Sequence, residues 1–402
     1  MRHGLIVDRI RAKSWRDAAG RNVFADRDWR LTVLTDRPGP EHEHLDRHTE
    51  LVVVPQLTTN SMREAIGAAH RSQPLSAIST TSELFLDAVA SMRDALGLPG
   101  PNARYTSTLR DKWRMKEIAR RCGLPHAMGV LGSDVNAAGE LLERYGRCIV
   151  KPRRLSGSRG VMIIRHRDQL QDWVRQCEDL SSYLVEEFVD GPLLHVDGMV
   201  IDGQVTWQLS QYERPTHLAG GRTPLSSFTV DDPIWLERTE EFLGLIVRSW
   251  SLNNDVFHCE MFATDRGPIF CELAGRPGGA GVTTVFAATR GIDLRHAKTY
   301  LDFGEHVPQA DGAALRNEGG WSVFYALGGR FRGVEDNGLN LHYTREIRAR
   351  RGDVVGGRTF SGVGVATYTF LGDDTQSVRD AIRRYESEVR VLEDSGDHRD
   401  YD

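Results

Sequence analysis

The feature that most restricts how this 402-residue chain can fold is a pair of glutamates on two adjacent predicted strands. The apolar stretches 256–264 and 268–273 are separated by a turn signal, Asp-Arg-Gly at 265–267, and they therefore predict a β-hairpin. Glu260 lies on the first strand and Glu272 on the second, so an antiparallel pairing brings both carboxylates to neighbouring positions on one face. A cluster of surface ion pairs on a hairpin is the alternative interpretation.

Carboxylates placed in this way repel each other, so a proton or a divalent cation is expected between them. Magnesium is the natural cation, because it prefers oxygen ligands and is usually held by one or two carboxylates together with substrate phosphates. Arg276 follows within a glycine-rich segment at 274–281, and its guanidinium can hold a phosphoryl or carboxylate group through two parallel hydrogen bonds. The hairpin therefore predicts a metal site with an anion-binding arginine beside it.

A second candidate for anion binding is Lys151, near the end of the predicted strand 148–152. An ammonium group is costly to bury alone, so a lysine in this position should meet an anion. The polar loop that follows lets backbone N–H groups approach phosphate oxygens, and it contains Ser156, Gly157, Ser158 and Gly160. It is not a Walker A loop, because no Gly-Lys-Ser/Thr ends it and no helix follows. An exposed hairpin with a polar tip is the competing interpretation.

Two further segments carry residues suited to nucleotide binding. Lys112, on a predicted helix at 107–122, is another candidate cation, although most helical lysines simply face solvent. A predicted strand at 182–189 runs into acidic residues whose carboxylates could accept hydrogen bonds from an adenine amino group and ribose hydroxyls, while the backbone meets the edge of the base. The segment consists of Glu186, Glu187, Phe188, Val189 and Asp190, in which the acidic residues supply the carboxylates. A solvated strand edge is the alternative.

Two histidines, His195 and His258, lie within predicted strands near these acidic residues. Neither belongs to a His-x-His or His-x-x-x-His pair, so we interpret them as satisfied or half-buried side chains and not as metal ligands. Asp197 lies two residues from His195 and shares its strand face. That face could line a nucleotide or substrate pocket.

The rest of the chain bounds the fold class and excludes several functions. Strand-like runs at 31–35, 51–55 and 75–79 precede a helical pattern at 81–96, which predicts a small open α/β domain without a Gly-x-Gly-x-x-Gly dinucleotide site. Helices are also predicted at 233–251, 282–301 and 375–392. The net charge of −5 does not indicate nucleic-acid binding, and five cysteines without a Cys-x-x-Cys pair indicate reduced thiols. Because no run of 18 apolar residues occurs, we expect a cytoplasmic protein with no membrane partner.

Taken in order, these segments resemble the ATP-grasp superfamily. The resemblance runs from Arg-Asp-Lys at 110–112 through Val-Lys-Pro, the Gly/Ser loop and Glu-Glu-Phe-Val-Asp-Gly to the two glutamates and Ala-Gly-Arg-Pro-Gly-Gly. It covers residues 98 to 300 most closely, in a style similar to the carboxylate–amine ligase branch that includes L-amino acid ligases. It implies an α/β (α+β) ATP-grasp fold in four parts. These are an N-terminal open α/β pre-ATP-grasp domain at 1–103, a small subdomain with the flexible loop at 104–183, a large subdomain with the Mg-ATP site at 184–310, and a strand-rich C-terminal subdomain at 311–402.

The resemblance also implies a role for each site residue. Lys112 and Lys151 would contact the nucleotide phosphates under the loop 156–160, Glu186 would take the adenine amino group, and the segment from Glu187 to Val189 would meet the base. ATP would bind with Mg²⁺ or Mn²⁺ held by Glu260 and Glu272. Arg276 and Lys151 would act in catalysis, with Arg276 steadying the acyl phosphate.

Two positions depart from the family pattern. Many members carry Asn where this chain has Ala274, and many have an acidic ribose ligand where this chain has Pro192 and Leu193. For the ribose, Asp190, His195 or Asp197 could substitute.

The function that the resemblance implies is an ADP-forming ligase, which activates a small-molecule carboxylate as an acyl phosphate and joins it to an amine. Three alternatives stay open. The acceptor could be a thiol on a carrier protein, for which the basic stretch 345–351 would be compatible, the chain could bind ATP without catalysis, or it could be a phosphotransferase on the same fold. No nucleic-acid partner is expected, and a homodimer is left open.

Overall fold

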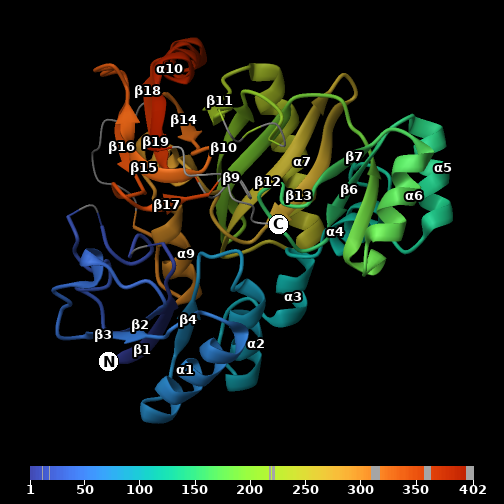
Figure 1. Ribbon diagram of the computed structural model, residues 1–402. Helices are drawn as coiled ribbons and strands as arrows, with labels where there is room; N and C mark the ends of the chain where they lie inside the picture. Colours follow the sequence, from blue (N-terminus) through green and yellow to red (C-terminus); the bar gives the residue numbers. More distant parts are fainter. Residues whose placement is uncertain are drawn as a thin grey trace.

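A computed structural model of the chain describes residues 1–10, 12–17, 19–216, 219, 222–308, 317–356 and 364–394. Figure 1 shows the chain coloured from its N-terminus to its C-terminus, with the central strands β9, β10, β12 and β13 in the middle of the molecule. Among the helices of the described segments, none has the length and apolar character needed to cross a membrane.

The N-terminal part is built on a four-stranded parallel sheet in the order β3-β2-β1-β4. Its strands are β1 Arg2–Val7, β2 Trp29–Thr35, β3 Thr49–Val53 and β4 Ala77–Ser79, and the helices α1 Thr59–Ser72 and α2 Leu86–Leu96 accompany them. The predicted open α/β arrangement is confirmed. The helix predicted at 81–96 begins later, at Leu86, because the preceding residues form a turn whose Thr80 hydroxyl bonds back to the backbone of β1.

The centre of the molecule is an eight-stranded sheet in the order β13-β12-β9-β10-β11-β14-β18-β16, with every pairing antiparallel. Its strands are β9 Leu193–Ile201, β10 Gln204–Tyr212, β11 Leu225–Thr229, β12 Asp255–Thr264, β13 Gly267–Ala274, β14 Glu318–Phe324, β16 Thr344–Ile347 and β18 Ala366–Gly372. The long helix α7 Pro233–Trp250 packs its apolar residues against the β9, β12 and β13 end of the sheet. The hairpin predicted on either side of residues 265–267 is confirmed, and β9 and β10 form another around residues 202–203.

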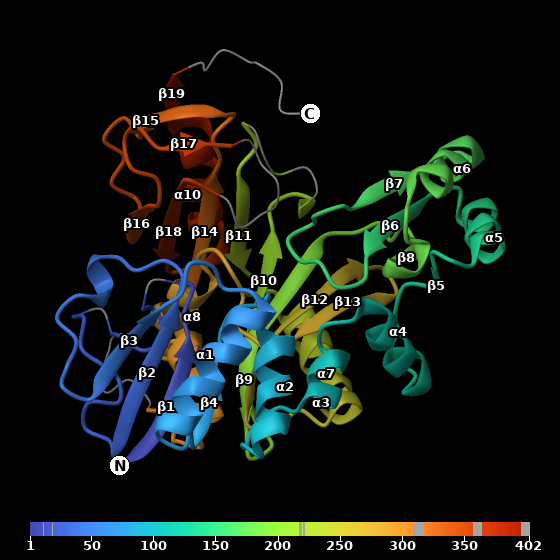
Figure 2. The same cartoon turned by 60° about the horizontal axis from the view of Figure 1, so that its bottom comes forward.

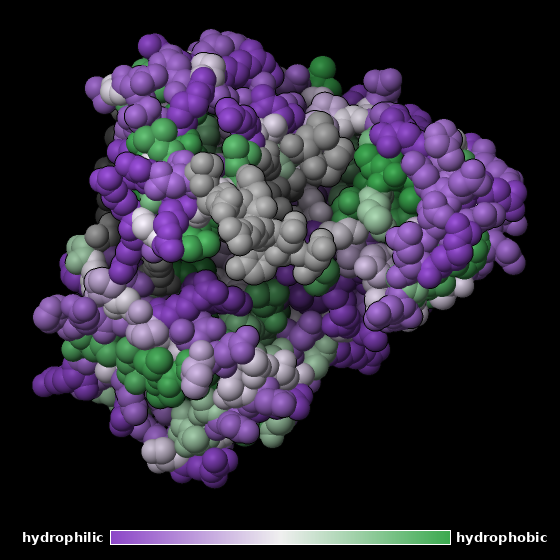
Figure 3. Space-filling view, in the orientation of Figure 1, coloured by the Kyte–Doolittle hydropathy of each residue, from purple (hydrophilic) through white to green (hydrophobic). Residues whose placement is uncertain are grey.

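A smaller four-stranded sheet in the order β5-β8-β6-β7 carries the glycine- and serine-rich loop between β6 and β7. It is built from β5 Gly129–Leu131, β6 Cys148–Pro152, β7 Met162–Ile164 and β8 Tyr183–Glu187, with α5 Val135–Tyr145 and α6 Arg167–Gln176 on one side. Figure 2 shows this lobe and the C-terminal lobe standing apart, with the strands β9, β10, β12 and β13 between them. The surface of the α5–α6 lobe is mainly hydrophilic in Figure 3.

Two helices that the sequence pattern predicts as continuous are broken by caps. The helix predicted at 107–122 consists of α3 Ala103–Thr108 and α4 Lys112–Arg121, because the Asp111 carboxylate accepts a hydrogen bond from the Trp113 amide and starts a new helix. The helix predicted at 282–301 consists of α8 Val282–Arg290 and α9 Leu294–Asp302. Gly291 ends the first in a left-handed conformation and Asp293 caps the second.

The C-terminal helix is shorter than its charge pattern predicts. Instead of continuing to residue 392, α10 Thr375–Glu388 ends, and the chain turns into β19 Arg390–Asp394. This strand pairs with β15 Gly329–Glu335 in a small sheet that also contains β17 Val354–Val355. Pairing with a distant strand satisfies the backbone of residues 390–394, and the helical pattern alone could not reveal it.

Candidate active site

The two glutamates singled out in the sequence are directly opposite each other across the β12–β13 hairpin, in the pairing Glu260↔Glu272. Their side chains are about four-fifths buried, with exposed fractions of 16% and 19%. Lys112 lies 2.9 Å from a Glu272 oxygen, and the Tyr212 hydroxyl donates to Glu260 at 3.1 Å. Burial by itself would raise the pKa of Glu272, but Lys112 and Lys151 lower it to about 2, so this carboxylate is ionised at neutral pH.

Lys112 is not a solvated helix residue, since it is buried in the first turn of α4. Besides contacting Glu272, its ammonium donates to the Leu155 carbonyl at 2.8 Å, immediately before the Gly/Ser loop. One ammonium group thus joins the start of α4, the base of the loop and the carboxylate pair.

Lys151 and Glu186 form the core of a second charged cluster. The Lys151 ammonium lies 2.5 Å from one oxygen of Glu186, and Lys116 lies 3.1 Å from the other. All three side chains are buried. Burial would raise the pKa of Glu186, but the two lysines hold it below its usual value. Sequence reasoning missed Lys116, although it lies one helical turn after Lys112 and so on the same face of the helix.

The remaining residues of the predicted adenine segment lie closer to the surface. The Glu187 carboxylate accepts a hydrogen bond from the Met128 amide at 3.0 Å, and Asp190 is exposed and paired with Arg147. The Arg147 guanidinium lies over the ring of Phe188, 4.1 Å from its centre. Val189 is half-buried beside them. Glu186 therefore points into the interior, whereas Asp190 does not.

Three residues of the loop between β6 and β7 have a left-handed backbone conformation, with φ of 70° at Gly157, 58° at Ser158 and 69° at Gly160. The Ser158 hydroxyl contacts the Thr216 hydroxyl at 3.0 Å, so the loop touches the connection between β10 and β11. Ser156 is half-buried at the start of this turn. Strands β6 and β7 pair as an antiparallel hairpin, and the Ser158–Thr216 contact joins its tip to the connection between β10 and β11.

Arg276 lies at the junction with the N-terminal part. It is paired with Glu83, which precedes α2 and also pairs with the buried Arg110. Its guanidinium donates to the Pro277 carbonyl at 2.7 Å as well. Sequence reasoning missed Glu83 and Arg110, because nothing in the local pattern of residues 80–85 indicates that this turn meets the Arg276 loop.

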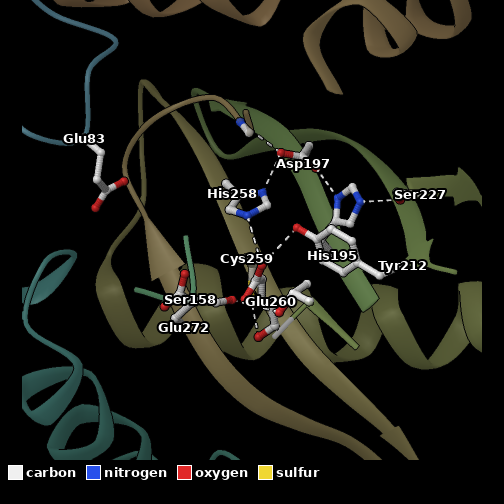
Figure 4. Close-up of polar contacts among 12 residues, drawn as sticks. Glu83, Ser158, His195, Asp197, Tyr212, Ser227, His258, Cys259, Glu260 and Glu272 are labelled. Atoms are coloured by element: carbon white, nitrogen blue, oxygen red, sulfur yellow. Dashed lines mark hydrogen bonds and ion pairs between the residues drawn. The ribbon is translucent and has the colours of Figure 1, made fainter. Parts of the chain in front are cut away.

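His195, Asp197 and His258 form a buried cluster next to the carboxylate pair, above it in the view of Figure 4. The two imidazoles contact the Asp197 oxygens at 2.6 Å and 2.8 Å through their Nδ1 atoms, and the His195 Nε2 atom contacts the Ser227 hydroxyl at 2.7 Å. Asp197 is only 2% exposed and both of its oxygens are occupied. In this structure the polar atoms of Asp197 and His195 are thus engaged by other groups of the protein.

This cluster offers three groups that could in principle hold a metal ion, with ligand atoms within 4.8 Å of one another. The short contacts are hydrogen bonds in length, and a carboxylate can only accept, so each Nδ1 carries a proton that points at Asp197. The arrangement favours the interpretation of both histidines as satisfied side chains. Burial would lower the pKa of His258, but Asp197 raises it to about 9.

Residues 145–285 match the sequence profile of the ATP-grasp domain family. The chain carries an ATP-grasp domain. This ATP-grasp domain includes the cluster of Lys151 and Glu186, the carboxylate pair and Arg276. The donor set fits Mg-ATP, because Glu260 and Glu272 supply hard oxygen ligands and the lysines around them supply positive charge for phosphates.

The ATP-grasp domain also has relatives of known sequence and structure. Alanine–anticapsin ligase of Bacillus subtilis strain 168 is 22% identical over 266 residues, which cover 59% of this chain and 56% of that ligase. The chain thus spans little more than half the length of this curated relative. In structure the chain is similar to an L-amino acid ligase from Bacillus licheniformis, with a TM-score of 0.76 and 15% identity over 98% of this chain and 99% of that one.

A further similar structure is the biotin carboxylase domain of 2-oxoglutarate carboxylase from Hydrogenobacter thermophilus, solved with MgADP. Its TM-score is 0.72 at 15% identity, over 97% of this chain and 90% of that one. The predicted ATP-grasp fold is confirmed by these likenesses, which extend over almost the whole length of the chain.

Proposed function

We propose that this protein is an ATP-dependent, ADP-forming ligase that joins a small-molecule carboxylate to an amine. The observation that carries the proposal is the cross-strand pair Glu260 and Glu272, placed beside Lys112 within an ATP-grasp domain. The similarity to alanine–anticapsin ligase in sequence and to an L-amino acid ligase in structure supports a ligase reaction. The four-part division at residues 103, 183 and 310 belongs to the same proposal.

In this proposal the two charged clusters bind the nucleotide. Lys112 and Lys151 contact the phosphates, and the Gly/Ser loop closes over them with backbone N–H groups of residues 156–160. Glu186 accepts from the adenine amino group, while the backbone of residues 187–189 meets the base. Glu260 and Glu272 hold Mg²⁺ or Mn²⁺, and the ion when bound would supply positive charge to the oxygens of the transferring phosphoryl group.

The reaction proceeds in two steps. First, an oxygen of the substrate carboxylate attacks the γ-phosphorus, and the bond from that phosphorus to ADP breaks. Arg276 and Lys151 stabilise the charge that builds on the transferring oxygens, since positioning and electrostatics are the main contributions to phosphoryl transfer. Second, the amine nitrogen attacks the acyl carbon, inorganic phosphate leaves, and the nitrogen loses a proton to give the amide. Exclusion of water by the loop protects the acyl phosphate from hydrolysis.

The thiol alternative has no specific observation in its favour. In the basic stretch 345–351, Arg345 pairs with Asp336 and Arg348 with Glu346, so part of its charge is neutralised within the chain. The amine therefore stays the proposed acceptor.

The test is a screen of ADP and phosphate release over amino acids and other small carboxylates, each combined with a set of amines, with products identified by mass spectrometry. We expect ADP and phosphate in equal amounts and a product whose mass equals acid plus amine minus water. A protein that binds ATP but releases no ADP with any acid would refute the ligase proposal. ADP release with a thioester product would replace the amine acceptor by a thiol.

A further inference from the structure

One buried carboxylate, Asp197 on β9, receives hydrogen bonds from two strands of the large sheet and from the loop that follows β13. His195, on the same strand, donates from Nδ1 to one oxygen at 2.6 Å. His258 on β12 donates from Nδ1 to the other oxygen at 2.8 Å, and the Gly278 amide donates to that same oxygen at 3.2 Å. Figure 4 shows Asp197 at the centre of these contacts. Asp197 is only 2% exposed, and all three of these donors belong to the protein itself.

Two of the three donors belong to segments that carry proposed active-site residues. His258 precedes Glu260 by two residues, so both side chains project from one face of β12, and its Nε2 atom lies 3.6 Å from a Glu260 oxygen. Gly278 lies two residues after Arg276 in the loop that follows β13. The third donor, His195, is the register partner of Glu260 on the adjacent strand. Its Nε2 atom, on the opposite side of the ring from Asp197, contacts the Ser227 hydroxyl.

The contact with the Arg276 loop is close as well as polar. A Cβ atom at position 278 would lie within 3.0 Å of both the Asp197 oxygen and the Val282 side chain, so only glycine allows the loop to approach in this way. Position 279, by contrast, is exposed, and a Cβ atom there would meet nothing within 4 Å. The loop is therefore held against Asp197 at one residue and is open at the next.

We propose that Asp197 is a positioning residue that fixes the Glu260 carboxylate and the Arg276 loop relative to each other, an inference that rests on the proposed function for the roles of those two residues. Through His258 the Asp197 carboxylate orients Glu260, and through the Gly278 amide it anchors the loop. One group thereby sets the distance between the metal carboxylate and the arginine that meets the transferring phosphoryl group. Outer residues of this kind orient ligands that themselves touch the metal.

Replacement of Asp197 by Asn keeps the shape of the side chain, but only one of its two terminal atoms can still accept a hydrogen bond. The new amide group would point a donor at an imidazole N–H or at the Gly278 amide, so at least one of the three hydrogen bonds is lost. The matched control is Ser227→Ala, which removes the contact at the far end of His195 but leaves the three donors to Asp197 in place.

The measurement is Mn²⁺ binding to the protein in the presence of ADP, followed by the loss of the electron paramagnetic resonance signal of free Mn²⁺. We expect Asp197→Asn to weaken Mn²⁺ binding by about 10- to 100-fold. Affinity for ADP without metal should stay at the wild-type value, and so should Mn²⁺ binding by Ser227→Ala. An Asp197→Asn protein with a native circular dichroism spectrum and wild-type Mn²⁺ affinity would overturn the proposal.

The coupling to the loop has its own pair of variants, Gly278→Ala and Gly279→Ala. A methyl group at position 278 must displace Asp197, whereas one at position 279 meets nothing within 4 Å. We therefore expect weaker Mn²⁺ binding for Gly278→Ala and wild-type binding for Gly279→Ala. Equal affinities in the two variants would overturn the coupling, and this pair decides the question if Asp197→Asn does not fold. The failure of the ligase proposal can be distinguished from the failure of this one. A wild-type protein that binds Mn²⁺ with ADP but releases no ADP from ATP would refute the ligase function, whereas the comparison of Mn²⁺ affinities among the variants could still be made.

Discussion

Glu186→Gln is the substitution whose effect follows most directly from the structure. The side chain is 3% exposed and its two oxygens lie 3.1 Å from Lys116 and 2.5 Å from Lys151. Each contact corresponds to an attraction on the order of 5 kcal/mol at an effective dielectric constant of about 20. The neutral amide keeps the size of the side chain but leaves two buried ammonium groups facing each other without a carboxylate.

The cost of that change has an upper limit, because a lysine can escape by losing its proton. Deprotonation at pH 7 of a lysine with an ordinary pKa costs about 5 kcal/mol. Removal of one partner of a buried ion pair typically costs about 3 to 5 kcal/mol, in agreement with this limit. We therefore predict that Glu186→Gln lowers the free energy of unfolding by about 3 to 5 kcal/mol at pH 7.

The pH dependence identifies the cause. In the folded variant the pKa of a buried lysine falls below its unfolded value, so the unfolded state binds more protons and stability rises with pH. The deficit relative to wild type should shrink by up to about 1.4 kcal/mol per pH unit above neutrality.

The assay is urea denaturation followed by tryptophan fluorescence at neutral and alkaline pH, with Glu187→Gln as the control. Glu187 is half-buried, and a glutamine oxygen can still accept from the Met128 amide, so its effect should be small. A deficit for Glu186→Gln below about 1 kcal/mol, or one that does not change with pH, would refute the reasoning.

Three further predictions use other parts of the molecule. Glu272→Gln should lower the rate of ADP release by about 100-fold or more while leaving the circular dichroism spectrum unchanged, and retained turnover would remove Glu272 from the metal site. In the native protein an alkylating reagent should modify the exposed Cys122 and spare the buried Cys259, because burial raises the pKa of the Cys259 thiol well above its usual value. Peptide mass mapping measures the order of labelling, and labelling of Cys259 before Cys122 would contradict this. Gly281→Ala should lower the free energy of unfolding by about 1 to 3 kcal/mol in urea denaturation, since a Cβ atom there would lie within 3.0 Å of Trp321. An unchanged denaturation midpoint would show that the backbone around residue 281 shifts to make room for the methyl group.

The sequence was most informative where contacts are local. The pairing of Glu260 with Glu272 follows from a short turn and two alternating strands, because turn length sets the register of a hairpin. Strands β2, β3 and β4 of the N-terminal sheet were predicted from similar local patterns, but β1, which pairs with both β2 and β4, was not. The helix breaks at Asp111 and Asp293 were not predicted, although both residues are good N-caps, because the apolar spacing continues across them.

What the sequence by itself determined is the set of chemical groups: a pair of carboxylates on a hairpin, two candidate lysines, a glycine-rich loop and an arginine after the hairpin. What only the tertiary structure decided is how those groups are held. Lys116 meets Glu186 from a different segment, Glu83 reaches Arg276 across 193 residues, and Asp197 collects donors from two strands and a loop. Sequence spacing reports neighbours along a strand or helix. Partners separated by hundreds of residues become neighbours only when the sheets pack, and burial then requires that every charge find one.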